Sequence, residues 1–158
     1  MPVNKSRKRH QGFSVIEMMV AIAVLSIIVG IGIPSFKSMM DRSRIDAAAD
    51  DLADGLRYAR SEALQRNTKV TLKDAGSGFV SGWSVVAGSD TLRKNSGMSS
   101  GVTTSHVDGN GVSKGDISFD GRGVASASTQ IQVSYSGLQR CIKLTLSGSV
   151  RQSDGACN

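Results

Sequence analysis

The chain has 158 residues, which is enough for one domain of ordinary size and a membrane segment. Its formal net charge of +6 includes four basic residues within the first nine positions. Without them the charge is +2, so the body of the chain offers little global evidence for nucleic-acid binding. Eighteen glycines, two prolines and 4% aromatic residues indicate a loop-rich domain with a modest core.

An apolar segment follows this basic head. From Phe13 to Phe36 the only ionisable side chain is Glu17, and the segment is long enough to cross a bilayer as a helix. No A-x-A-like cleavage site follows it, so the segment is predicted to be retained rather than removed with a secretory signal. The basic head then acts as a positive-inside signal that directs the C-terminal part outward. A lone carboxylate in such a segment is costly and usually functional.

The pattern becomes amphipathic after Pro34. Proline lacks an N–H and clashes with the preceding turn, so the helix is predicted to kink or break there. Apolar residues then recur at spacings of three and four, which predicts one helical stripe down to about Asn67. The whole helix would be about 80 Å long at 1.5 Å per residue, half membrane anchor and half spine of a domain. The stripe contains Ile45, Ala49, Leu52, Leu56, Ala59 and Ala63.

Beyond Asn67 the period of the apolar residues shifts towards two, which predicts half-buried antiparallel strands. The glycine- and serine-rich region 95–115 is predicted to be a long loop with one short strand near Val102. The fold class predicted is α+β, a long N-terminal helix packed on an antiparallel sheet. The strands are expected at residues 69–73, 82–87, 116–120, 129–136 and 141–146.

The N-terminal motif consists of the basic head, Gly12, Phe13, three residues, Glu17 and an apolar helix with a proline. It resembles the class III signal of type IV prepilins and type II secretion pseudopilins. The resemblance implies that prepilin peptidase cleaves between Gly12 and Phe13 and N-methylates Phe13. It also implies that Glu17 neutralises the N-terminal amine of a neighbouring subunit during assembly, in agreement with the need of a buried carboxylate for a cation. The alternative is a plain signal anchor with Glu17 at the membrane interface.

The same resemblance divides the chain into three parts. Residues 1–12 are expected to be a leader that is removed, and residues 13–40 a transmembrane and filament-core helix. Residues 41–158 are expected to form a soluble periplasmic α+β domain. The protein would be a single-pass inner-membrane protein before assembly and part of the extracellular pilus afterwards.

Motifs further along the chain carry a second resemblance. They are L-R-Y-A-R-S-E-A-L-Q-R-N at 56–67, V-T-L at 70–72, Gly82-Trp83, Gly121, and C-I-K-L-T-L-S-G at 141–148. Together they resemble the FimT/FimU/GspH group of minor pilins and pseudopilins, most of all its FimU members. This implies a type IV pilin fold and a sparse subunit that helps prime pilus assembly and joins the tip complex to the shaft. Implied partners are other minor pilins, the major pilin and prepilin peptidase.

Type IV pilins commonly have a disulfide-bounded C-terminal region, and Cys141 with Cys157 resembles such a pair. Both cysteines suit an oxidising periplasm. A loop of this length gives a stabilisation of about 3 kcal/mol in a chain-entropy estimate. A metal site is not predicted, because two cysteines sixteen positions apart and the distant His106 match no zinc spacing.

Enzymatic function is not expected, and no cofactor is predicted. His106 is the only histidine after the leader, and its glycine- and serine-rich surroundings predict a solvated loop residue. A catalytic histidine needs an acid to orient it and a nucleophile within reach, and the neighbouring sequence offers neither.

Two other functions remain as alternatives. One is a GspH-like pseudopilin of type II secretion, which the sequence barely separates from a minor pilin. The other is a DNA receptor, because FimT-type pilins include receptors whose C-terminal G-R-x-R motif presents paired arginines to phosphates. The corresponding residues 148–151 read G-S-V-R, so one arginine is missing and DNA binding should be weaker. Candidate DNA contacts are Arg140, Lys143 and Arg151, and this function is not favoured.

Overall fold

A computed structural model describes residues 12–76, 78–108 and 115–157. The chain divides into two compact units, Met1–Ser38 and Met39–Asn158. Of the expected leader, only Gly12 lies within the described residues.

The first unit contains the N-terminal part of α1 (Val15–Arg66), a helix long and apolar enough to cross a membrane. Its described side chains from Phe13 to Ser38 are all exposed. A helix that is apolar all round requires a bilayer or other helices around it. The helical backbone continues through Pro34 as one element, and a kink at this position stays a prediction.

In the second unit, the C-terminal half of α1 buries the stripe that its spacing predicts. All six stripe residues are at most 1% exposed. They join a core that includes the fully buried Trp83, Phe79 and Phe119. The helix therefore stabilises this unit through tertiary packing rather than helix propensity alone.

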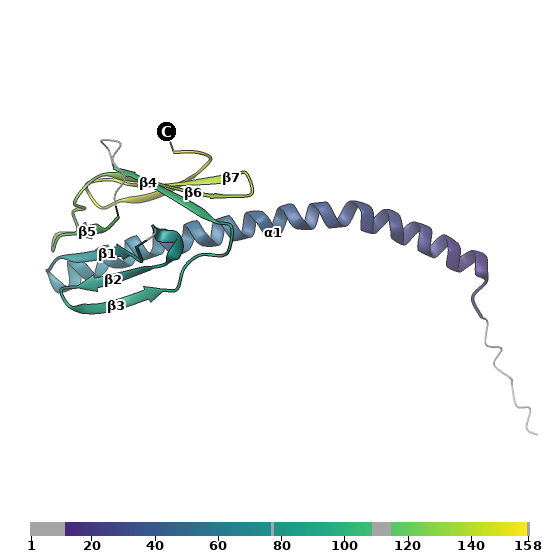
Figure 1. Cartoon of the computed structure of the whole chain (residues 1–158), viewed down its shortest axis with the longest axis horizontal. Helices are drawn as coiled ribbons and strands as arrows, with labels where there is room; N and C mark the ends of the chain where they lie inside the picture. Colours follow the sequence, from purple (N-terminus) through teal and green to yellow (C-terminus); the bar gives the residue numbers. More distant parts are fainter. Residues whose placement is uncertain (1–11, 77, 109–114, 158) are drawn as a thin grey trace, which may run out of the picture. The chain divides into compact units, whose positions relative to one another are not determined.

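Within the described residues, eight strands form two antiparallel sheets, with the orders β3-β2-β1-β5 and β4-β6-β7-β8 (Figure 1). The first sheet contains β1 (Val70–Asp74), β2 (Trp83–Ala87), β3 (Asp90–Asn95) and β5 (Ile117–Phe119). The second contains β4 (Thr103–Asp108), β6 (Thr129–Tyr135), β7 (Leu138–Leu144) and β8 (Val150–Asp154), and a short 3-10 helix, η1 (Phe79–Ser81), lies between β1 and β2. The predicted α+β class with a long helix on antiparallel strands is confirmed, but the strands divide between two sheets.

The strands β3 and β8 are absent from the sequence prediction. Each has one aliphatic residue, Leu92 in β3 and Val150 in β8, so the alternating pattern that reveals a half-buried strand does not appear. Both lie at sheet edges, where short and charged strands are common. The boundaries of β7 also differ from the predicted 141–146, and β4 occupies part of the predicted loop 95–115.

The prediction that His106 lies in a solvated loop is wrong. The residue belongs to β4, pairs in register with Ile131 of β6 and is only 9% exposed. Its ring centroid lies 5.5 Å from that of Phe79. The glycine and serine residues around this segment predict a loop, and the strand forms only because it pairs with β6, which is distant in sequence.

Candidate functional site

The predicted processing site lies where the described chain begins. Gly12 is exposed with no heavy atom within 4 Å of an added Cβ, and Phe13 is 79% exposed. Glu17 lies in the first turn of α1, where a carboxylate complements the positive end of the helix dipole. Cleavage after Gly12, methylation of Phe13 and the assembly role of Glu17 stay predictions.

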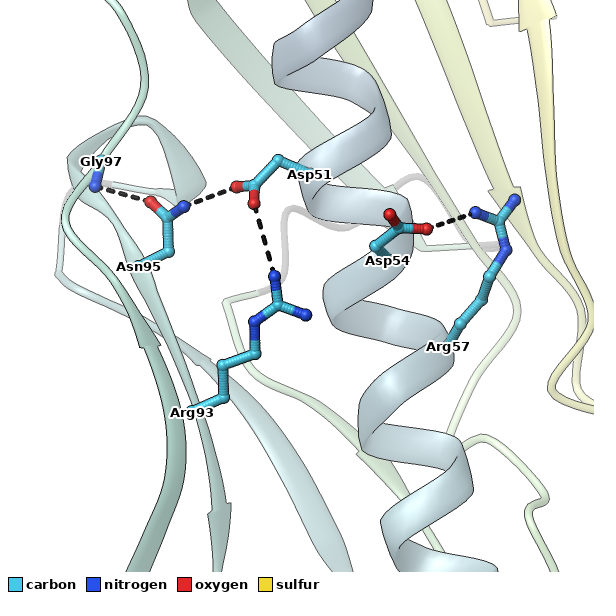
Figure 2. Close-up of polar contacts among 6 residues, drawn as sticks. All are labelled: Asp51, Asp54, Arg57, Arg93, Asn95 and Gly97. Atoms are coloured by element: carbon cyan, nitrogen blue, oxygen red, sulfur yellow. Dashed lines mark hydrogen bonds and ion pairs between the residues drawn. The ribbon is translucent and has the colours of Figure 1, made fainter.

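A polar network in the second unit joins α1 to β3 (Figure 2). The side-chain amide of Asn95 donates to Oδ2 of Asp51 at 2.6 Å, and Oδ1 of Asp51 lies 3.8 Å from the guanidinium group of Arg93. Oδ1 of Asn95 accepts a hydrogen bond from the backbone N–H of Gly97 at 2.7 Å. One helical carboxylate therefore fixes both an edge strand and the turn that follows it.

Arg93 also packs on aromatic rings. Its guanidinium carbon lies 5.3 Å from the ring centroid of Trp83 and 5.8 Å from that of Tyr58. Trp83 also packs so closely against the helix that a Cβ added at Gly55 would lie 2.9 Å from the ring. The preceding Gly82 has a φ of 117°, a conformation that suits glycine. The Gly82-Trp83 dipeptide thus allows β2 to pack closely against the helix.

A glycine cluster encloses Arg60 near the C-terminal end of α1. Nε of Arg60 donates to the carbonyl oxygen of Gly123 at 3.2 Å. A Cβ added at Gly148 would collide with that carbonyl oxygen and would lie 2.6 Å from Nε of Arg60. At Gly121, an added Cβ would lie 2.7 Å from the backbone of Asn67. Only glycine leaves room for these close approaches. The glycines of motifs that are far apart in sequence therefore allow those segments to pack against the end of α1.

Polar contacts of Arg140 and Gln152 help to join α1 to the second sheet. Nε of Arg140 donates to Oδ1 of Asp46 at 2.6 Å, and the same guanidinium group pairs with Asp154. The hydrogen bond to the Asp46 carboxylate is the main cause of a raised pKa for Arg140. The side-chain amide of Gln152 donates to Oδ1 of Asp50 at 3.1 Å. The edge strand β8 is therefore fastened to the helix as well as to β7.

The three candidate DNA contacts do not share one face of the second sheet. Lys143 and Arg151 lie opposite each other in the register of β7 and β8, so their side chains share a face. Arg140 lies three residues before Lys143 and therefore points to the other face, towards α1. There it is engaged by Asp46 and Asp154. The structure brings two of the three cations together and commits the third to an internal role.

Cys141 and Cys157 form a disulfide, as the resemblance implies. Cys141 is fully buried in β7, and the backbone N–H of Cys157 donates to Oε1 of Gln132 on β6 at 3.3 Å. The loop that the bond closes contains β8. The C-terminal tail is therefore held by a strand pairing and by a covalent bond.

Within the described part of the chain, His, Cys, Asp and Glu form no group of three or more that could hold a metal ion. Both cysteines are used in the disulfide. The polar contacts described above connect the helix to the sheets. These contacts hold the second unit in a fixed shape with defined surfaces.

A family model described as type II transport protein GspH matches residues 48–149, well over half of the chain. The chain belongs to the GspH family. A second model, the prokaryotic N-terminal methylation motif, matches residues 7–33 of this GspH-family chain, which include Gly12, Phe13 and Glu17. The resemblance to FimT/FimU/GspH-type pilins is confirmed.

Relatives of this GspH-family chain are fimbrial proteins of Dichelobacter nodosus. One, named fimbrial protein, is 30% identical over 147 residues, which are 92% of this chain and 88% of the relative. The type IV major fimbrial protein FimA is 31% identical over 71 residues, or 45% of this chain, and the match spans only 44% of FimA.

Two solved structures of the type IV minor pilin FimU from Pseudomonas aeruginosa share the fold of this GspH-family chain. In the first, in space group P21, the match has a TM-score of 0.62 at 20% identity and covers 73% of this chain and 92% of the chain in that crystal structure. In the second, in space group P65, the match has a TM-score of 0.58 and covers 68% of this chain and 91% of the chain in that crystal structure. The type IV pilin fold expected from the sequence is therefore confirmed.

Sequence reasoning misses the residues that fix β3 in this GspH-family chain. Asp51 is one of several acids on the polar side of α1, and nothing in its spacing distinguishes it from Asp54. Arg93 and Asn95 lie in a strand that has no alternating pattern. The Gly82-Trp83 dipeptide was the available signal, because a lone tryptophan after a glycine marks a position of close packing.

Proposed function

We propose that this chain is a minor type IV pilin, a structural subunit that helps prime pilus assembly and joins the tip minor-pilin complex to the shaft. The observation that carries the proposal is the 30% identity to a fimbrial protein across 92% of the chain. The methylation motif supports processing by prepilin peptidase and anchoring in the inner membrane before assembly.

Each unit of the structure suits a separate task in such a subunit. The exposed apolar helix of the first unit is chemically suited to exchange a lipid environment for other apolar helices. In the second unit, Asp51 of α1 bonds to the first sheet through Asn95, and Asp46 of α1 bonds to the second sheet through Arg140. A domain fastened in this way presents its surfaces in fixed positions, which the recognition of partner subunits requires.

A GspH-like pseudopilin of type II secretion is the second candidate function. The description of the matching family model favours it. A DNA-binding pilin is supported only by the juxtaposition of Lys143 and Arg151, because Arg140 is engaged by two carboxylates.

Deletion of the gene, with separate assays for surface pili and twitching, exoprotein secretion and natural transformation, tests the proposal. We expect loss of pili and twitching with normal secretion, and recovery when the wild-type gene is supplied. Loss of secretion with normal pili would instead establish the pseudopilin. Loss of transformation with pili intact would establish the DNA receptor.

A further inference from the structure

Three exposed large apolar side chains of the second unit come from segments that lie close together. They are Leu64, Val124 and Leu146, which are 48%, 40% and 56% exposed. A Cβ added at Gly123, next to Val124, would lie 3.1 Å from the side chain of Leu64. The backbone N–H of Ala125 donates to the carbonyl oxygen of Leu146 at 2.9 Å. The three exposed residues therefore come from segments that are in contact, and we call them the apolar end patch.

Basic residues and a hollow border the apolar end patch. A hollow of about 300 Å³ beside Leu146 is lined also by Lys143, and Arg151 lies opposite Lys143 on β8. Arg122, two residues before Val124, has a side chain that is 83% exposed and pairs with Asp120. Because Arg122 is engaged by Asp120, the cations that this border adds to the apolar centre are Lys143 and Arg151, and such a surface fits a partner that presents an apolar side chain beside carboxylates.

We propose that the apolar end patch docks a different pilin-type subunit, one that inserts an apolar side chain flanked by carboxylates. The inference rests on the proposed function, because it assumes that the chain assembles with other pilins. It adds the surface used and the chemistry of the partner. Clusters of exposed apolar side chains on a domain that otherwise buries them mark interaction sites.

A second copy of this chain fits the patch poorly. Among the residues of the second unit that the structure describes, the other exposed large apolar side chains are Met39 and Met40. They are followed by Asp41 and then by Arg42 and Arg44, which are both exposed, and the guanidinium group of Arg44 donates to the hydroxyl of Tyr135 at 2.6 Å. Their guanidinium groups would oppose the basic rim of the patch, and like charges brought together disfavour a contact.

A membrane or a nucleic acid also fits less well than a protein. Interfacial membrane binding uses a larger apolar face, often with aromatic anchors, whereas the patch consists of three aliphatic side chains. Nucleic acids bind through phosphates and stacked bases, to which a leucine or valine side chain offers little. An apolar side chain from a protein is the occupant that gains from this surface.

Crosslinking in the full-length chain tests the docking directly. The photo-crosslinking residue p-benzoylphenylalanine would replace Leu146 in one strain and Thr91, an exposed residue of β3, in a control strain. After irradiation, sheared filaments would be analysed by mass spectrometry. We expect an adduct between position 146 and a different pilin-type subunit, with much less at position 91. An adduct with a second copy, DNA or lipid, or none at 146 in filaments that contain the chain, would overturn the proposal.

Affinity measurements on the second unit provide the matched mutational test. Its core lies wholly within residues 39–158, so this unit contains what it needs to fold. Leu146→Glu should weaken binding to the crosslinked subunit about tenfold, whereas Thr91→Glu, with the same charge change, should not. Both variants should melt like the wild type, because both positions are exposed. Equal affinity of the two variants would contradict the proposed docking site but not the proposed pilin function. Absence of the chain from filaments would contradict both proposals.

Discussion

Three carboxylates on α1 show how surroundings determine what an aspartate or glutamate does. Glu17 is the only ionisable side chain in an exposed apolar stretch. Asp51 faces Arg93 and Asn95 of another element. Asp54 pairs with the nearby Arg57 of the same helix at 2.8 Å, and both side chains are at least half exposed (Figure 2). The first is predicted to act in assembly, whereas the second stabilises tertiary structure and the third lies on the solvated surface.

Glu17→Ala should leave cleavage after Gly12 intact but impair incorporation into filaments. The physical reason is that the N-terminal amine of a neighbouring subunit would lose its counter-charge in apolar surroundings. Cleavage is measured by the mass of the membrane-bound chain, and incorporation by its amount in sheared filaments. Normal recovery from filaments would exclude this role for Glu17.

Asp51→Ala should destabilise the second unit by about 1–2 kcal/mol, because it removes the acceptor for the Asn95 amide and the helical carboxylate that faces Arg93. Asp54→Ala is the matched control, with the same chemical change on the same helix and an expected loss below about 0.5 kcal/mol. Urea unfolding of both variants measures the difference. Equal losses would show that the network to β3 adds nothing beyond a surface ion pair.

At the scale of elements, predictability depends on whether a segment shows its pairing in its own sequence. The α1 stripe is readable because Leu52 and Leu56 recur on one helical face and are both fully buried. Central strands such as β6 alternate and are predicted well. The edge strand β8 is held by Gln152, by Arg140 of β7 and by the disulfide, none of which produces a periodic pattern. Contacts between distant segments therefore mark the limit of single-sequence reasoning.

Cys157→Ser should lower the melting temperature of the second unit under oxidising conditions. Opening the Cys141–Cys157 loop restores chain entropy to the unfolded state, an effect of at most about 3 kcal/mol for a loop of this length. Thermal unfolding with and without reductant measures it. The wild type should fall to the melting temperature of the variant when reduced, and the variant should not respond. An unchanged melting temperature would mean that β8 is held by its other contacts alone.

At the scale of the whole molecule, the family and the apolar N-terminal helix could be predicted because their motifs are short segments in a fixed order along the sequence. The apolar end patch could not be predicted. Leu64, Val124 and Leu146 come from three separate segments and become a patch only after folding. Basic residues show the reverse case, in which neighbours in the sequence are separated in the structure. Arg140 and Lys143 are neighbours in sequence that look like one cationic site, and the alternation of β7 sends them to opposite faces.

DNA binding by the second unit should therefore be weak. Lys143 and Arg151 provide two adjacent cations, and so few phosphate contacts predict low affinity that falls only gently with salt. Titration of residues 39–158 with duplex DNA at low and near-physiological salt measures this, with Lys94→Ala, an exposed lysine of β3, as the control for Arg151→Ala. We expect no saturable binding at near-physiological salt. Micromolar binding that falls steeply with salt and is lost in Arg151→Ala but kept in Lys94→Ala would make a DNA receptor the better proposal. In that case the face shared by β7 and β8, rather than the apolar end patch, would be the principal binding surface.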